Sequence, residues 1–232
     1  MKKLVILPAY NEGSNIKNTI EDVKAHAPGY DYIVINDCST DNTVEICEEN
    51  KIPYISLPVN LGIGGAMQTG YRYAFEHGYE LAVQLDGDGQ HDASFLRTME
   101  KELCRKQADM VIGSRFIKKE GYQSSRIRRL GIAFFSRLIR LCTGTRIADP
   151  TSGFRMVGRD LIASFAREYP RDYPEPESIV SVIRQKKKIV EIPVIMRERQ
   201  GGVSSIGLFK SVYYMVKVTL AILVECVRKP VR

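Results

Sequence analysis

Two aspartates separated by one residue could bind a metal ion together. Asp86 and Asp88 lie in the segment DGDGQH, residues 86–91, directly after a short aliphatic run at 81–85. Carboxylates at this spacing can reach one hard cation, and Mg²⁺ or Mn²⁺ prefers oxygen ligands that it shares with substrate phosphates. Asp-Gly pairs are also common in turns, so the segment alone fits a plain turn equally well.

A second polar loop follows the hydrophobic run at 32–35. Asn36 and Asp37 stand there, and their polar edges could bind a base or a ribose. The same loop has a structural interpretation, in which Ser39 or Asp41 caps the next helix. Such a cap does not require Asn36 and Asp37, so both interpretations can hold together.

An aromatic loop, PAYNE at residues 8–12, follows the first aliphatic run at 4–7. The ring of Tyr10 could stack on a base, although an ordinary strand-to-helix turn would have a similar sequence. All three loops come directly after predicted strands. Open α/β sheets bind ligands beyond the carboxyl ends of their strands, so we expect the loops to meet in one site.

A glycine-rich stretch at 61–66 invites comparison with nucleotide-binding loops. The G-x-G-x-x-G/A pattern fails because Met67 occupies its third position, and the stretch follows the third predicted strand rather than the first. The chain also has no G-x-x-x-x-G-K-[ST] loop. We therefore expect a loop that enters a helix, with the helix N-terminus facing phosphate.

Alternating strand and helix patterns position these loops. Aliphatic runs predict strands at 4–7, 32–35, 53–57, 81–85 and 110–113, and helical spacing predicts helices at 14–27, 41–50, 66–77 and 94–106. Later segments predict a strand at 153–157, helices at 159–168 and 176–186, a strand at 189–196 and a long apolar C-terminal helix. This order predicts an α/β fold with a mostly parallel central sheet flanked by helices.

Composition narrows the class of protein. The 232 residues carry a net charge of +7, which suits anionic partners, and five separated cysteines without a C-x-x-C pair fit a reducing compartment. The N-terminus lacks the features of a signal peptide, and no run of about 18 uncharged apolar residues indicates a membrane-spanning helix. Residues 121–148 contain six arginines and no acidic residue, but no nucleic-acid-binding motif.

An ordered set of segments along the chain resembles glycosyltransferase family 2, especially the dolichyl- and undecaprenyl-phosphate sugar transferases. The segments are PAYNE (8–12), NDCSTD (36–41), NLG (60–62), DGDGQ (86–90), GSR (113–115), DPTSGFR (149–155) and RQGGVS (199–204). The resemblance covers nearly the whole chain. Two departures are Asn36, where relatives often have aspartate, and the lack of the transmembrane helices that many relatives carry.

The resemblance implies a GT-A fold, an inverting mechanism and a UDP- or GDP-sugar donor. It implies donor contacts at Pro8, Tyr10, Glu12, Asn36, Asp37, Asn60, Gly62 and Asp86. It implies that Asp86, Asp88 and Gln90 hold Mg²⁺ or Mn²⁺, and that Arg115 and Arg199 bind phosphate. Asp88, Arg115 and Arg199 are accordingly candidate catalytic residues.

The acceptor decides whether a general base is needed. A phosphate monoester, with a second pKa of about 6, is largely dianionic at neutral pH and can attack without one. A sugar hydroxyl needs a base, and Glu177 is our candidate because its spacing to Glu191 resembles that of a family glutamate. Glu177 would equally suit the acidic start of a helix.

Membrane contact is expected in two regions. Arginines and apolar residues alternate in 121–148, which suits an interfacial helix on anionic lipid, although a core helix with solvated arginines has the same pattern. We assign Arg128, Arg129 and Ser204 to the acceptor phosphate or the membrane. A break at Gly201-Gly202 divides a catalytic domain, 1–205, from a C-terminal helix, 206–232. That helix is either buried, or lies in the membrane interface or against a small membrane-spanning partner.

The leading hypothesis is transfer of a sugar to a polyprenyl (undecaprenyl) phosphate for cell-surface glycan synthesis. We expect a cytoplasmic enzyme, peripherally bound to the inner face of the cell membrane, with an anionic membrane surface and a small membrane-spanning protein or a second copy as partners and no nucleic acid. One alternative is transfer to a sugar hydroxyl of a lipid-linked polysaccharide. The other is a non-catalytic nucleotide-sugar-binding subunit, against which the complete set of candidate carboxylates and arginines argues.

Overall fold

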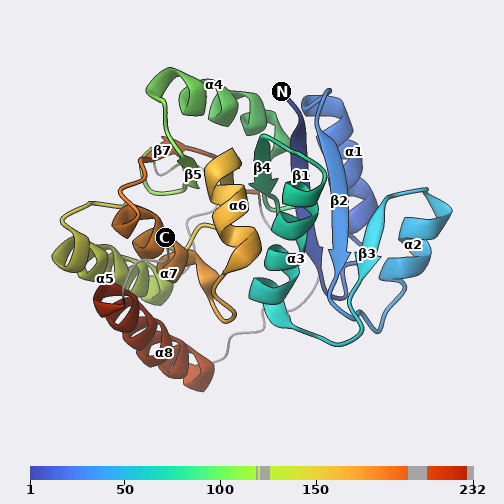
Figure 1. Ribbon diagram of the computed structural model, residues 1–232. Helices are drawn as coiled ribbons and strands as arrows, with labels where there is room; N and C mark the ends of the chain where they lie inside the picture. Colours follow the sequence, from blue (N-terminus) through green and yellow to red (C-terminus); the bar gives the residue numbers. More distant parts are fainter. Residues whose placement is uncertain (119, 121–125, 198–207, 229–232) are drawn as a thin grey trace.

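The computed structural model describes residues 1–118, 120, 126–197 and 208–228, which fold around one seven-stranded sheet (Figure 1). The strands are β1 (Lys3–Ala9), β2 (Asp31–Asn36), β3 (Tyr54–Ser56), β4 (Leu81–Gln84), β5 (Met110–Ser114), β6 (Arg155–Gly158) and β7 (Ile189–Pro193). The helices are α1 (Ile16–His26), α2 (Thr43–Glu49), α3 (Gly62–Glu76), α4 (Leu96–Lys106), α5 (Arg126–Thr143), α6 (Arg159–Arg167), α7 (Pro174–Arg184) and α8 (Leu208–Val227), with a 3₁₀ turn at Ala93–Phe95.

The sheet has the strand order β3-β2-β1-β4-β6-β5-β7. Neighbouring strands are parallel except at β6, which pairs antiparallel with both β4 and β5. The predicted α/β class with a mostly parallel sheet is therefore confirmed. The antiparallel β6 matters for the site because it carries the loop that precedes it back to the carboxyl ends of β4 and β5.

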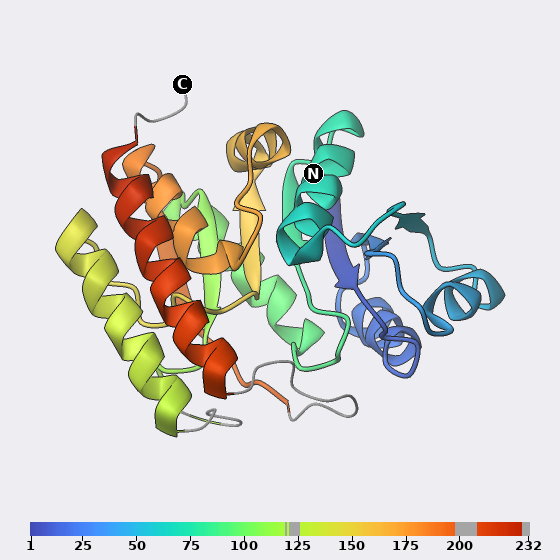
Figure 2. The same cartoon turned by 90° about the horizontal axis from the view of Figure 1, so that it is seen from below.

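Both faces of the sheet are buried, because successive side chains of a strand point to opposite faces. Leu4 and Ile6 of β1 join the core under α3, α5, α6, α7 and α8, whereas Val5 and Leu7 join the core under α1, α2 and α4. Figure 2 shows α5 and α8 side by side at one end of the molecule, far from α1 and α2. This end of the molecule thus has a second layer of helices outside the sheet.

Helix α3 begins at Gly62, four residues before the start that the sequence predicted. The glycines that argued for a loop are instead required by close packing inside the helix. A Cβ at Gly64 would lie 2.1 Å from the Arg171 carbonyl oxygen, and a Cβ at Gly70 would lie 2.3 Å from Cγ2 of Ile6. Small residues therefore let α3 approach both β1 and the chain after α6.

Helix α7 also begins earlier than predicted, at Pro174 rather than 176. Both Pro174 and Pro176 fit its first turn, where backbone N–H groups have no partner within the helix. The strand predicted at 189–196 ends at Pro193.

Helix α8 packs on the body of the protein with one face. Val218 and Ile222 are buried in the core, and the Tyr214 ring makes edge contacts with Phe135 and Tyr173 at centroid distances of 5.6 and 4.5 Å. The Arg184 guanidinium of α7 donates to the last carbonyls of α8. Among the described residues, no helix is long and apolar enough to cross a membrane.

Gly70→Ala tests the packing of α3 against β1. We expect the free energy of unfolding to fall by about 1–3 kcal/mol, because the added methyl group collides with the Ile6 side chain in a close-packed core. Urea denaturation measures the change. Arg72→Ala, an exposed position in the same helix, is the control and should stay within about 0.5 kcal/mol of wild type. Equal stability of the two variants would contradict the close contact.

Candidate active site

The loops after β1, β2 and β4 meet at one edge of the sheet, as the carboxyl ends of parallel strands require. They line a cleft of about 290 Å³, together with the start of α3 and one residue of α7. The lining residues are Pro8, Ala9, Tyr10, Glu12, Asp37, Ile63, Ala66, Asp86, Gly87, Asp88 and Glu175. The structure therefore brings together most of the residues that the sequence assigned to the donor and the metal.

The first two loops are joined to each other by hydrogen bonds. Asn11, with a positive φ of 58°, accepts the Thr40 N–H at its side-chain oxygen at 2.8 Å. The Glu12 N–H donates to Thr43 Oγ1 at 3.0 Å, and the Asn15 amide donates to a Glu12 carboxylate oxygen at 2.8 Å. These bonds hold Tyr10 at the rim of the cleft, where its side chain is half exposed and open to a ligand ring.

Asp37 is buried and holds the N-terminus of α3. Its carboxylate accepts the Leu61 and Gly62 N–H groups at 2.7 and 2.9 Å, and its carbonyl accepts the Asn60 amide at 3.1 Å. Asn36, also buried, donates to Ser56 and accepts the Ser39 N–H. The helix N-terminus predicted to face phosphate is thus occupied by a carboxylate. Of the four predicted donor residues in this region, Asp37 lines the cleft, and Asn36, Asn60 and Gly62 take part in the hydrogen bonds around it.

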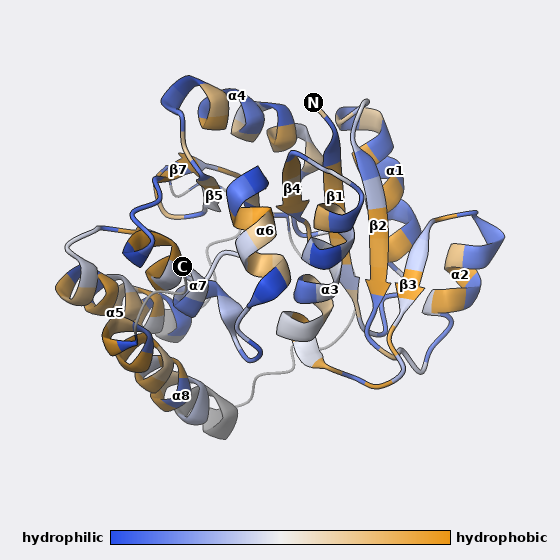
Figure 3. Ribbon diagram, viewed as in Figure 1, coloured by the Kyte–Doolittle hydropathy of each residue, from blue (hydrophilic) through white to orange (hydrophobic). Residues whose placement is uncertain are grey.

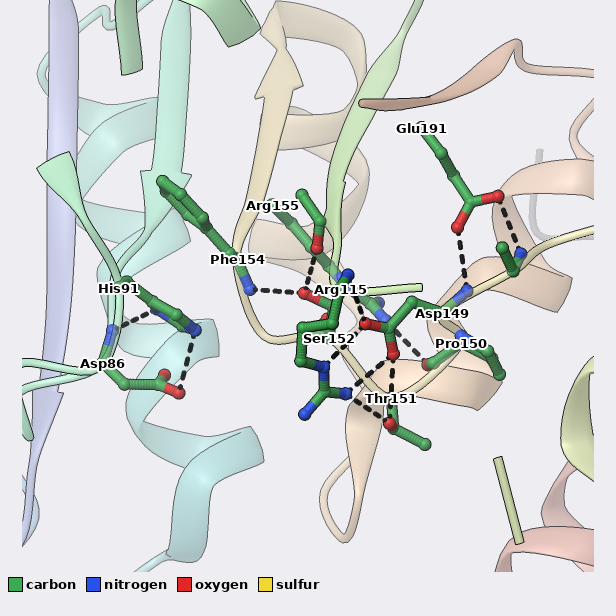
Figure 4. Close-up of polar contacts among 12 residues, drawn as sticks. Asp86, His91, Arg115, Asp149, Pro150, Thr151, Ser152, Phe154, Arg155 and Glu191 are labelled. Carbon is green, nitrogen blue, oxygen red and sulfur yellow. Dashed lines mark hydrogen bonds and ion pairs between the residues drawn. The ribbon is translucent and has the colours of Figure 1, made fainter. Parts of the chain in front are cut away.

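Asp86 makes hydrogen-bonding contacts with His91 (Figure 4) and Gln84 and lies close to Gly153. Its N–H donates to His91 Nδ1 at 3.0 Å, so the neutral imidazole carries its proton on Nε2, which lies 3.6 Å from Asp86 Oδ2. The Gln84 amide donates to Oδ1 at 3.2 Å. A Cβ at Gly153 would lie 2.9 Å from Gln84 Nε2 and 3.2 Å from Asp86 Oδ2, so a side chain at this position would crowd both groups.

Asp88 lies in the same cleft, in a turn closed by its own side chain. Its Oδ1 accepts the Gln90 N–H at 3.0 Å, and the Gln90 carbonyl accepts the Arg197 N–H at 3.0 Å. Arg197 in turn pairs with Asp22 and Asp92 at 3.1 and 3.0 Å. The two oriented carboxylates fit a Mg²⁺ or Mn²⁺ ion that takes its other ligands from a diphosphate and water. Among the described residues, no cluster of three or more His, Cys, Asp or Glu side chains forms a metal site by itself.

Arg115 forms a bidentate ion pair with Asp149, which is fully buried (Figure 4). Its Nε and Nη2 each donate to the carboxylate at 2.7 Å, and Nη2 also donates to Thr151 at 2.9 Å. Glu191 supports this pair by accepting the Ala148 and Asp149 N–H groups at 2.7 and 2.9 Å. Such forked pairs fix the guanidinium plane, so Arg115 is held in one orientation at the edge of the site.

Arg155 has a buried guanidinium group. In the sequence it stands out only as the last residue of the DPTSGFR segment, residues 149–155. It donates to the carbonyls of Ser152, Pro150 and Glu175 at 2.7, 3.0 and 2.8 Å, and to the Ser178 hydroxyl at 2.8 Å. It thereby fixes the 149–154 loop to the first turn of α7. A charged residue in a short hydrophobic strand was the sequence signal for this role.

The two glutamates of α7 have different surroundings. Glu175 lines the cleft with Asp86 and Asp88, and burial raises its pKa, with a further rise from Asp86 and an opposing effect of Arg155. Glu177, the predicted base, lies instead in a separate cavity of about 470 Å³ beside Arg184 and Arg228. The sequence assigned the base to Glu177 through its spacing to Glu191, and this spacing does not show which glutamate of the turn faces the cleft.

Four remaining candidates lie outside the cleft or outside the described part of the chain. Arg128 and Arg129 lie in the first turns of α5, both exposed, and Arg129 lines a basic groove described below. Arg199 and Ser204 fall outside the described residues.

A mostly parallel sheet with paired aspartates at the carboxyl end of β4 defines a GT-A-type α/β fold. Glucosyl-3-phosphoglycerate synthase from Mycobacterium tuberculosis, solved with Mn²⁺, UDP and phosphoglyceric acid, superposes with a TM-score of 0.77 over 98% of this chain and 79% of its own. The two sequences are 19% identical, so this likeness shows the shared fold.

The chain belongs to glycosyl transferase family 2, whose model matches residues 4–165. It is 28% identical over 216 residues to undecaprenyl-phosphate mannosyltransferase of Micrococcus luteus, with 89% of this chain and 88% of the relative covered. It is 29% identical over 214 residues to UDP-N-acetylglucosamine–dolichyl-phosphate N-acetylglucosaminyltransferase of Methanococcus voltae, with coverages of 82% and 83%. The protein is thus a glycosyltransferase.

Glu175→Gln tests the partly buried carboxylate in the cleft. Because burial raises the pKa of Glu175, the folded state binds more protons than the unfolded state between the ordinary pKa of 4.5 and the raised one. The free energy of unfolding contributed by this group therefore falls as the pH rises through that window. In EDTA we expect Glu175→Gln to be more stable than wild type near neutral pH, with the difference lost below the ordinary pKa.

Urea denaturation at a series of pH values measures this difference. Glu45→Gln, at an exposed position on α2, controls for the loss of one carboxylate at the surface. A wild-type and Glu175→Gln pair with the same pH dependence would contradict the raised pKa of Glu175.

Proposed function

We propose that this glycosyltransferase transfers a sugar from a UDP- or GDP-sugar to a polyprenyl phosphate at the cytosolic face of the membrane, for cell-surface glycan synthesis. The observation that carries the proposal is the cleft, where two oriented aspartates face an exposed tyrosine from neighbouring strands. The names of the two relatives, which act on undecaprenyl and dolichyl phosphate, support the acceptor class.

The donor would lie along the cleft with its base on Tyr10 and its diphosphate near Asp86 and Asp88. A divalent cation, held by these two aspartates with Gln90, would neutralise the charge that develops on the leaving nucleoside diphosphate. Glu12 and Asp37 lie at the base and ribose end, and Gly62, Asn60 and Asn36 hold that wall in place.

The acceptor would approach from the side of Arg115. A phosphate dianion needs positioning rather than deprotonation, and Arg115 is held rigidly for that role by Asp149. Arg128, Arg129, Arg199 and Ser204 complete our proposed acceptor side. Glu175, rather than Glu177, lies where a carboxylate can accept hydrogen bonds from the hydroxyl groups of the donor sugar.

A second candidate function is transfer to a sugar hydroxyl of a lipid-linked glycan. One observation favours it, namely that the Glu175 carboxylate lies in the cleft with a raised pKa, as suits a general base. The two functions share the donor site and differ in what they require of this residue.

One product analysis tests both proposals. Purified protein is incubated with Mn²⁺, a panel of UDP- and GDP-sugars and undecaprenyl phosphate, and the lipid fraction is analysed by mass spectrometry. A glycosyl monophosphate lipid is the expected product. No product from this lipid, with sugar added instead to a lipid-linked glycan, would contradict the polyprenyl phosphate acceptor.

Asp88→Asn tests the metal-binding role. We expect turnover to fall by about a hundredfold or more, the effect typical of removing charge stabilisation from a transition state. Asp160→Asn is the control, because Asp160 is exposed and pairs with Lys187 away from the cleft. Unchanged turnover in Asp88→Asn, or full activity in EDTA, would exclude metal binding here. Circular dichroism confirms that each variant is folded.

Glu175→Gln and Glu177→Gln form a matched pair on one helix turn. If Glu175 only binds the donor, we expect about a tenfold loss of turnover, whereas loss of a general base gives about 10²–10⁴-fold. Turnover of Glu177→Gln should stay near wild type, since Glu177 lines the other cavity. A larger loss of turnover in Glu177→Gln than in Glu175→Gln would contradict this assignment and favour Glu177 as the general base.

A further inference from the structure

Two neighbouring helices carry most of the large apolar side chains that are exposed in the described residues. Helix α5 exposes Leu130, Phe134 and Leu141, and the exposed fraction of Leu141 reaches 85%. Helix α8 exposes Tyr213, Val216, Leu220, Leu223, Val224 and Val227. In Figure 3, orange hydrophobic segments run along both helices. An apolar surface of this extent is uncommon on a monomeric protein and indicates an interaction site.

The exposed faces of the two helices adjoin. The helices run side by side in the same direction (Figure 2). They are in contact, because a Cβ at Gly131 would lie 3.1 Å from the Met215 sulfur and Phe135 packs on Tyr214. At about 100° per residue, Val216 and Leu223 follow next to Met215 around α8, and Phe134 lies on the α8 side of α5. One continuous apolar strip therefore crosses both helices, and we call it the α5/α8 strip.

On α8, the strip belongs to a helix that is packed firmly on the body of the protein. Val218 and Ile222 bury the opposite face of α8. Lys217 pairs with Asp172 at 2.8 Å, and Arg228 pairs with Glu168 at 2.5 Å, so both charges are tied to the body. Because these contacts already use the inner face, the outer face is left for a partner.

A row of arginines borders the strip on α5. Arg129, Arg137 and Arg140 lie on one side of that helix and, with Arg146, line a groove of about 570 Å³. None of these four makes an ion pair or hydrogen bond with a described residue. No acidic residue occurs anywhere in 121–148. The groove therefore offers positive charge that the described part of the protein does not neutralise.

We propose that the α5/α8 strip and its arginine row dock the protein on an anionic phospholipid bilayer. The apolar strip would enter the boundary of the acyl chains, and the arginines would contact headgroup phosphates beside it. Charge complementarity favours a bilayer over a second copy of the chain, because a second copy would bring another unneutralised arginine row.

The inference rests on the proposed function and deepens it by naming the surface that meets the lipid. Phe116 and Ala148, which line the arginine groove, are chain neighbours of Arg115 and Asp149. The groove therefore opens beside the ion pair on the acceptor side of the cleft. Docking at the strip places the Arg115–Asp149 pair close to the plane of the headgroup phosphates. The phosphate group of a polyprenyl phosphate lies in the same plane.

Vesicle flotation of the full chain tests the proposal, with phosphatidylcholine vesicles that contain or lack phosphatidylglycerol. Arg137→Ala/Arg140→Ala should lower the partition coefficient on anionic vesicles by about twenty-five-fold, at about fivefold per arginine. Leu220→Ser/Val224→Ser should lower binding to both kinds of vesicle. Arg97→Ala/Lys101→Ala on α4 and Phe75→Ser on α3, all exposed, are the matched controls and should float like wild type.

Wild type that fails to float on anionic vesicles, or both double variants floating like wild type, would overturn the proposal. A dimer in light scattering that Leu220→Ser/Val224→Ser abolishes, without vesicle binding, would also overturn it and assign the strip to a second copy. Sugar transfer to a short-chain polyprenyl phosphate in detergent is measured on the same samples. Flotation without transfer would remove the proposed function alone, and transfer without flotation would remove the docking surface alone.

Discussion

The buried guanidinium of Arg155 holds the 149–154 loop against the first turn of α7. It is the first residue of the antiparallel strand β6, and its donors bind carbonyls of the preceding loop and of the first turn of α7. A buried charge is costly unless its donors are satisfied, and here four hydrogen bonds satisfy it. The loop from 149 to 154 is therefore fixed although it has no regular secondary structure.

Much of the chemistry follows from that loop. Gly153 lies beside the Asp86 carboxylate, Asp149 orients Arg115, and one of the carbonyls that Arg155 binds belongs to Glu175. The loop thus separates an acidic cleft, suited to a metal and a diphosphate, from a basic side, suited to a phosphate acceptor. The negative charges of the cleft and the positive charge of Arg115 stay on separate sides, because each group is held by its own hydrogen bonds.

The sequence predicted the sheet and the meeting of three loops, because hydrophobic runs and strand direction are local properties of the chain. It did not predict that Asp37 caps α3 or that His91 orients Asp86, because both roles depend on the loop conformation. It assigned the base to Glu177 from the spacing to Glu191, whereas Glu175 lines the cleft, because spacing along the chain does not determine which side of α7 faces the site. The apolar pattern of the C-terminal helix predicts a helix that is buried, lies in the membrane interface or docks on a membrane-spanning partner, and α8 has one buried face and one exposed apolar face. The assignment of the exposed face to a membrane stays a prediction.

The central claim is that the cleft of Asp86 and Asp88 binds a nucleoside diphosphate through a divalent cation. Calorimetric titration of UDP and of GDP into the wild-type protein, with Mn²⁺ and then with EDTA, tests it most directly. We predict that one of the two nucleotides binds with Mn²⁺ and that EDTA weakens this binding at least about tenfold, as loss of a bridging cation implies. Equal affinity with and without the metal, or no binding of either nucleotide, would contradict the account.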